Sequence, residues 1–119
     1  MELRRKRAYD TAESSDGFRV LVDRLWPRGV SKERAEIDLW AKDTAPSPEL
    51  RQAWHAASDD EWSAHADRYR AELDGESASA LEDLAGELKK HEVVTLVYAA
   101  RDEQHNHAVV LDEALRGLL

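Results

Sequence analysis

Apolar and polar residues alternate along the first third of the chain in the manner of β-strands. Segment 18–25 presents Phe18, Val20 and Val22 on one face of an extended chain. This period of two, with β-branched residues, predicts a strand that ends before Pro27 and Gly29. Segment 37–41 alternates in the same way and predicts a second short strand. Segment 3–9, separated from residue 18 by a turn cluster over 12–17, is interpreted as an edge strand.

From residue 47 onward the apolar positions recur at helical spacing instead. Ser47 and Pro48 are typical of a helix start and predict a helix over 48–57. Ser58 and Glu61 form a capping-box pattern that predicts a helix over 59–73, ended by Gly75. A third helix is predicted from Ser77 or Ser79 to about residue 91, and a fourth over 103–118 with Asp102 as its cap.

The most apolar run of the chain is VVTLVYA over residues 93–99. A short, continuous, β-rich run predicts a buried central strand. Strands separated by helices indicate an α/β fold, a small two-layer or three-layer sandwich. We expect a short, at least partly parallel sheet of about three to four strands, with about four helices, in one domain over residues 1–119.

Composition removes several classes of protein. The 119 residues are 42% apolar, and none is a cysteine, which excludes disulfides, thiol nucleophiles and cysteine-ligated metals. No apolar run is long enough for a membrane span, and no apolar segment follows the basic start as in a signal peptide. We therefore expect a cytoplasmic protein with no membrane association.

The net charge of −8 is unevenly distributed. Residues 1–34 hold nine Lys and Arg against six Asp and Glu, and the remaining residues hold eight against nineteen. An acidic chain is disfavoured as a general nucleic-acid binder, because phosphate contacts depend on Lys and Arg. The basic run over residues 4–7 is either a phosphate patch or a guard against edge pairing.

Polar residues gather after two of the predicted strands, in segments 23–29 and 98–107. Ligands of open α/β sheets bind beyond the carboxyl ends of the strands, where a helix N-terminus also favours anions. We expect the arginines to hold a phosphate or carboxylate and the aromatic rings to stack. The candidate ligand-binding residues are Arg24, Trp26, Arg28, Tyr98, Arg101 and Asn106. The alternative is a structural charge network in which the arginines pair with Asp23, Asp43 or Asp102.

His105 and His107 are the candidates for proton transfer, because histidine titrates near neutrality. Two residues apart, they would lie on nearly opposite sides of a helix and are poor joint metal ligands. No HExxH, GxSxG, GxGxxG or phosphate-loop motif is present. The sequence therefore predicts no metal and no cofactor, and it leaves open whether the protein is catalytic.

Four segments together resemble one family. They are DGFRVLVDRLWPRG (16–29), DLWAKDTAPSPELR (38–51), RYRAEL (68–73) and TLVYAARDEQHNHAVVL (95–111). In this order they resemble the domain of unknown function 488 (DUF488) family, in its short YeaO-like branch, over nearly the whole chain. The resemblance implies a small cytoplasmic prokaryotic α/β domain without an assigned function. Some relatives are labelled as transcription regulators, but this sequence contains no basic recognition helix that would support such a role.

Other branches of that family place a cysteine, a histidine and an arginine in succession near the last helix. The matching stretch here is Asn106-His107-Ala108, which keeps only the histidine. Three functions follow as hypotheses. The first, which we favour, is a binder of a small anionic or nucleotide-like ligand, with or without catalysis. The second is a non-catalytic interaction or regulatory module, with an unknown protein partner. The third is nucleic-acid binding through residues 4–7.

Overall fold

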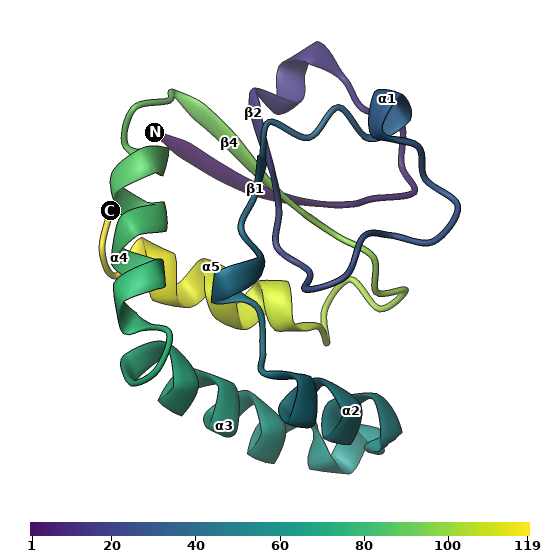
Figure 1. The fold of residues 1–119 in the computed structure, drawn as a ribbon, viewed down its shortest axis with the longest axis vertical. Coiled ribbons are helices and arrows are strands. Elements are labelled where there is room, and N and C mark those ends of the chain that lie inside the picture. The colour runs from purple at the N-terminus through teal and green to yellow at the C-terminus, as the bar shows by residue number, and fades with distance from the viewer.

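A four-stranded, fully parallel sheet forms the centre of the protein. The computed structural model describes all residues from 1 to 119. The strand order is β1-β4-β2-β3, so β4 is inserted between two strands that both lie more than 70 residues before it in the chain (Figure 1). The strands are β1 (Glu2–Arg7), β2 (Phe18–Leu21), β3 (Leu39–Trp40) and β4 (Val93–Tyr98). The parallel pairing aligns the carboxyl ends of all four strands at one edge of the sheet.

β4 was expected to be the buried central strand, and it is. Val94, Leu96 and Tyr98 point into the main core on one face, while Thr95 and Val97 are buried on the other. A strand buried on both faces needs the near-continuous apolar sequence that residues 93–98 provide.

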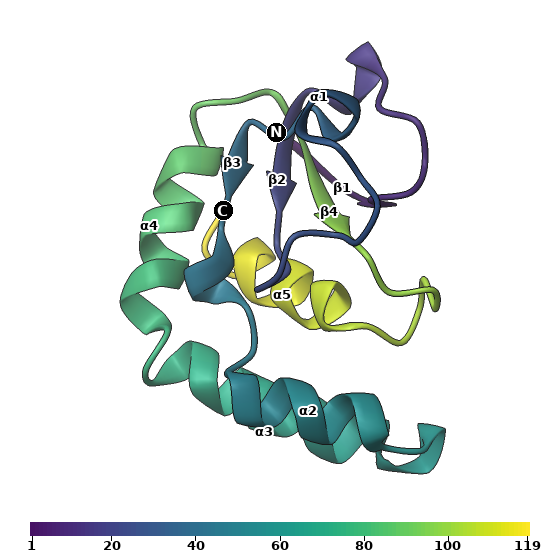
Figure 2. The same cartoon turned by 45° about the vertical axis from the view of Figure 1, so that its right-hand side comes forward.

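Helices cover one face of the sheet and loops cover the other (Figure 2). The main core joins the sheet to α3, α4 and α5, with α2 packed on α3. The opposite face is closed by loops and the one-turn helix α1. The helices are α1 (Lys32–Ala35), α2 (Pro48–Ala56), α3 (Trp62–Asp74), α4 (Ala78–Leu88) and α5 (His107–Arg116). None of them is both long enough and apolar enough to span a bilayer.

Several predicted boundaries differ from the observed ones. The strand predicted over 18–25 ends at residue 21, and the capping box at 58–61 opens a 3-10 turn before α3 begins at Trp62. The helix predicted from residue 103 begins at His107, because Asn106 rather than Asp102 caps it. Helix α1, only four residues long, has too few residues to show a helical period in the sequence.

The loop face contains a buried charge network beneath the β1–β2 connection. The Asp16 carboxylate accepts from Arg19 Nη1 at 2.7 Å and lies 3.2 Å from Lys6 Nζ. The Thr95 hydroxyl donates to the Asp16 carbonyl at 2.7 Å, which ties the network to β4. Gly17 follows with φ +66°, and a Cβ there would lie 2.3 Å from the carbonyl oxygen of Val93. Only glycine therefore allows the chain to turn this close to β4.

Replacing Asp16 by asparagine should destabilise the fold in a pH-dependent way. At pH 7 we expect Asp16→Asn to lower the free energy of unfolding by roughly 2 to 3 kcal/mol, because Arg19 loses its buried counter-charge. Burial raises the pKa of Asp16, but hydrogen bonds from the Glu13 N–H, Lys6 and Arg19 outweigh burial and hold this pKa below its ordinary value.

The unfolded chain therefore binds this proton more readily than the folded one. The stabilisation is present above the unfolded-state pKa of about 3.9 and is lost as the pH falls through the lower folded-state pKa. Urea unfolding at pH 7 and pH 3 should show the difference between wild type and variant shrinking at pH 3. An equal difference at the two pH values would contradict this account.

Candidate functional site

Asp23, two residues after the end of β2, joins the carboxyl ends of the two central strands to α5. Its Oδ2 accepts from the Ala99 N–H at 3.0 Å, and its carbonyl accepts from Trp40 Nε1 at 2.7 Å. Its Oδ1 lies 3.2 Å from His107 Nε2 at the start of α5. From the sequence, Asp23 was expected only as a possible partner for an arginine. Its position at the end of a predicted strand was the signal that could have placed it at the carboxyl edge of the sheet.

His107, one of the two proton-transfer candidates, is fixed by these contacts. Its Nε2 lies 3.1 Å from the Val22 carbonyl, which is its hydrogen-bond acceptor, while Asp23 Oδ1 meets the ion-pair distance but not hydrogen-bond geometry. Since both neighbours are acceptors, Nε2 carries a hydrogen and donates it to the Val22 carbonyl. The side chain is 17% exposed and its ring meets the edge of Tyr69, so this nitrogen faces the interior.

Loop 99–106 orders its own backbone. Asn106 is buried; its Oδ1 accepts from the Val109 N–H, and its Nδ2 donates to the Asp102 carbonyl at 2.8 Å. The Asp102 carboxylate accepts from the N–H groups of His105 and Gln104, which hold the pKa of Asp102 below its usual range. Asn106 thus acts as the N-cap of α5. The N–H groups of Gln104 and His105, which could have bound an anion, are instead bonded to the Asp102 carboxylate.

His105, the other proton-transfer candidate, lies on the surface of this loop. Its ring stacks on Trp62 of α3, with centroids 4.9 Å apart. Trp62 in turn lies 5.8 Å from Trp54 of α2. Both tryptophans are half-buried in this aromatic contact between helices.

The three predicted arginines have different surroundings. The Arg24 guanidinium donates to the carbonyls of Pro46 at 3.0 Å and Ala45 at 3.3 Å, and so fixes the entry to α2. Arg28 and Arg101 are exposed, and their side chains make no hydrogen bond or ion pair within the protein. The structure therefore does not join Arg24 to the two free guanidiniums.

Trp26 closes the loop face. Its Nε1 donates to the Val30 carbonyl at 2.6 Å, and its ring meets Trp40 edge-on at 5.5 Å. Both rings cover a small apolar cluster formed by Ala8, Leu21 and Val97. These contacts occupy Trp26 in packing.

The basic run over residues 4–7 is divided between the two faces of β1. Lys6 turns to the loop face and pairs with Asp16, while Arg5 turns to the helix face and pairs with Asp112 at 2.8 Å. Two of the four cations are thereby neutralised by carboxylates that are themselves buried.

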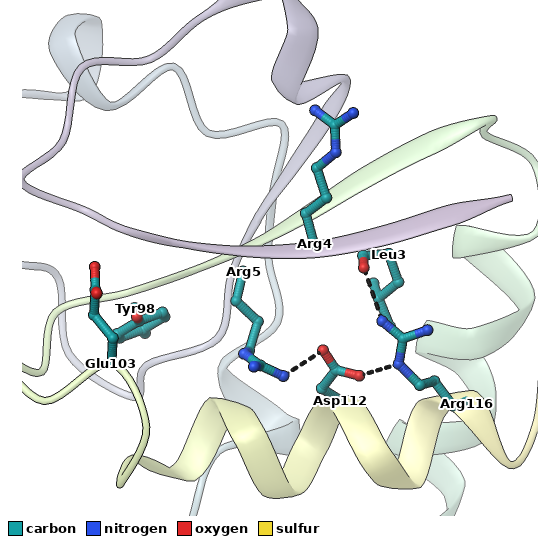
Figure 3. Close-up of a pocket in the computed structure, with 7 residues that line it drawn as sticks. All are labelled: Leu3, Arg4, Arg5, Tyr98, Glu103, Asp112 and Arg116. Carbon is teal, nitrogen blue, oxygen red and sulfur yellow. Dashed lines mark hydrogen bonds and ion pairs between the residues drawn. The ribbon is translucent and has the colours of Figure 1, made fainter.

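An open hollow of about 340 Å³ lies between β1 and α5 (Figure 3). Arg5 and Arg116 converge there on Asp112 from its two sides, whereas the Arg4 side chain points away and donates to the Ser15 carbonyl. Tyr98, at the carboxyl end of β4, is the one predicted site residue in the lining. The lining residues are Leu3, Arg4, Arg5, Tyr98, Glu103, Asp112 and Arg116.

Sequence reasoning missed most of this lining. Asp112 lies beside the apolar stripe of α5. A buried carboxylate needs a cation or hydrogen-bond donors, so its position in the sequence could have predicted a paired cation. One partner, Arg116, is four residues further along the same helix and could have been found from that spacing, whereas Arg5 is 107 residues away and could not. No group of three His, Asp or Glu side chains is arranged to hold a metal ion.

Comparison with known proteins identifies relatives along the whole chain. The family model described as "Inactive DUF488-N3 subclade" matches residues 2–119. The uncharacterized protein YeaO of Escherichia coli strain K12 is 43% identical over 99% of this chain and 100% of its own length.

Mycobacterial relatives are similarly close. The uncharacterized proteins Mb3100c of Mycobacterium bovis and Rv3073c of Mycobacterium tuberculosis are each 41% identical over 93% of this chain and 91% of their own. No solved structure matches the chain.

The Asp23 contacts predict a measurable loss of stability. Asp23→Ala leaves the Ala99 N–H without its acceptor and removes the charge beside His107, so we expect the free energy of unfolding to fall by about 2 kcal/mol. Urea unfolding measures this, with Asp43→Ala as the control, since Asp43 is exposed. The control should change stability by no more than about 0.5 kcal/mol. Equal stability of the two variants would show that Asp23 does not hold this junction.

Proposed function

The chain belongs to the DUF488 family, and from that premise we propose that it binds a small anionic ligand, without catalysis, in the hollow between β1 and α5. The observation that carries this proposal is a pair of guanidiniums held on the two sides of one buried carboxylate, in a hollow that is also lined by a tyrosine with no hydrogen bond in the protein. The hollow runs along the β1 edge of the sheet, from Leu3 near the start of β1 to Tyr98 at the carboxyl end of β4.

The Asp112 carboxylate acts as the positioning group. It is 4% exposed, accepts from Arg5 Nη1 at 2.8 Å and pairs with Arg116 Nε. Arg116 Nη2 also donates to the Leu3 carbonyl at 2.9 Å. Two guanidiniums on one carboxylate leave a net positive charge, and each retains N–H donors beyond those bonds. An incoming carboxylate or phosphate would meet pre-oriented donors, which reduces the entropy lost on binding.

Tyr98 supplies a donor on the other side of the hollow. Burial raises the pKa of Tyr98, and the nearby Glu103 raises it further, so the phenol stays protonated at neutral pH. The side chain lines the hollow and forms no hydrogen bond within the protein. A protonated hydroxyl beside guanidiniums fits an anionic acceptor.

The size of the hollow is consistent with a small ligand. Its volume of about 340 Å³ is near the lower end of the range for small-molecule sites, roughly 300 to 1,000 Å³. Glu103, exposed at the rim, repels a second negative charge, which favours ligands with one compact anionic group over extended polyanions.

Binding without catalysis is the form of the proposal that the surroundings support. Neither His105 nor His107 lines the hollow, and His107 is fixed between Val22 and Asp23. The matching family model is described as an inactive subclade. A cytoplasmic location stays a prediction from the sequence.

Isothermal titration calorimetry with inorganic phosphate, acetate and AMP tests the proposal. We expect binding of at least one of these anions to the wild type. Tyr98→Phe should weaken that binding roughly 5- to 10-fold, the effect of losing about 1 to 1.4 kcal/mol of hydrogen bonding. Glu103→Gln should strengthen it several-fold, because a like charge is removed from the rim.

Glu82→Gln on α4 is the matched control, since Glu82 is exposed and lies outside the hollow. It should leave the affinity unchanged. The proposal fails if none of the anions binds, or if Tyr98→Phe, Glu103→Gln and Glu82→Gln all bind with the affinity of the wild type.

A further inference from the structure

A second basic surface surrounds Tyr9, at the carboxyl end of β1. The Tyr9 hydroxyl donates to the Arg28 carbonyl at 3.0 Å, and Arg34 Nη2 donates to the Tyr9 carbonyl at 3.5 Å. The Arg7 guanidinium lies 5.4 Å above the Tyr9 ring. With Leu25, these residues form what we name the Tyr9 surface: Arg7, Tyr9, Leu25, Arg28 and Arg34.

Leu25 belongs to this surface through the turn that carries it. Trp26 packs on the cluster that contains Ala8, and Arg28 holds the Tyr9 hydroxyl, so the turn over 25–28 lies against residues 8–9. Leu25 is 56% exposed and Tyr9 37%. Apart from residues at the chain ends, these are the large hydrophobic side chains that the protein leaves exposed.

The arginines of the Tyr9 surface differ from four other cations of the same third of the chain, which are paired with carboxylates; Arg24 and Lys32, outside this surface, are unpaired as well. Arg4, Arg5, Lys6 and Arg19 each lie within 4 Å of a carboxylate. Arg7, Arg28 and Arg34 have no such partner; Arg7 Nε donates instead to the Ala100 carbonyl at 2.9 Å. Their charge is therefore available to a partner.

We propose that the Tyr9 surface docks an acidic segment of a partner protein, with an apolar side chain of that segment on Leu25 and its carboxylates on Arg28 and Arg34. Charge complementarity selects the acidic partner, and exposed leucine selects a protein over a nucleic acid, which has no aliphatic side chain to cover it. Arg7 already covers one face of Tyr9, which leaves this ring poorly placed as a stacking platform for bases.

This interaction lies outside the hollow, so the two proposals stand or fall separately. None of the five residues of the Tyr9 surface lines the hollow. Arginines at the rim of an interface mainly raise the association rate and make it salt-dependent, while a buried apolar contact slows dissociation. Both contributions can be measured with a model segment.

Fluorescence anisotropy with a fluorescein-labelled peptide EELEELEE tests the docking. We expect it to bind the wild-type protein, more weakly as salt increases. The double variant Arg28→Glu/Arg34→Glu should lose at least tenfold in affinity. The peptide EESEESEE should bind several-fold more weakly than EELEELEE, and Leu25→Ser should remove that difference between the peptides.

The control is Arg68→Glu/Lys89→Glu, which reverses two exposed, unpaired cations on the helical side of the protein. It carries the same change in net charge and should bind EELEELEE within about twofold of the wild type. If the control lost as much affinity for EELEELEE as Arg28→Glu/Arg34→Glu, the loss would be explained by net charge alone, and the proposal would be overturned.

Three further outcomes would also overturn it. One is EELEELEE affinity weaker than about 1 mM, which corresponds to less than about 4 kcal/mol of binding. Another is tighter binding of an octathymidine than of EELEELEE, which would make the surface a nucleic-acid site. The third is self-association that Arg28→Glu/Arg34→Glu abolishes, which would make the occupant a second copy with its acid-rich helical region.

Discussion

The insertion of β4 between β1 and β2 is the constraint on which the other features of the structure depend. Until residues 93–98 occupy that gap, neither face of the sheet is complete. β4 contacts β1 and β2 along its length, and Thr95 and Ala99 complete the bonding of Asp16 and Asp23. Pairing strands this far apart costs loop-closure entropy, which the burial of β4 on both faces offsets.

Two carboxylates then attach α5 to the sheet that β4 has completed. Asp23 contacts the start of the helix through His107, and Asp112 draws its far half to Arg5 on β1. The hollow exists because α5 is held at those points while Tyr98 and Glu103 enclose the open side between them. The proposed ligand site is thus a consequence of how the last helix is anchored.

The outline of this architecture could be predicted from the sequence because it rests on local patterns. The apolar run at 93–98 and the Ser47-Pro48 helix start depend on neighbouring residues only, and both predictions were confirmed. The cap of α5 could not be chosen in the same way, since Asp102 and Asn106 are both good capping residues. The packing of the loop decides between them. Asn106 is buried at the start of α5, whereas the Asp102 carboxylate accepts from the His105 N–H within the loop.

The candidate site was harder to predict for a related reason. The partners of Arg24 are carbonyl groups, which every residue possesses, so no residue type in the sequence signals them. Asp112 binds cations that are separated from it by 107 residues on one side and four on the other. Tyr98 could be found because its place at the end of an apolar strand is a local feature, and strand ends meet at one edge in a parallel sheet.

The pairing of the cations shows which charges the fold uses more clearly than net charge does. A carboxylate within reach lowers the free energy of a buried cation, so the pairs at Asp16 and Asp112 are explained by folding alone. An exposed guanidinium that bonds only a carbonyl, or nothing, gains no such stabilisation from its charge. Arg28 and Arg34 have no carboxylate partner, yet both are hydrogen-bonded to Tyr9, whose side chain is exposed. Charge that the fold does not use, placed beside apolar surface that the fold does not bury, is what the proposed docking of an acidic segment would use.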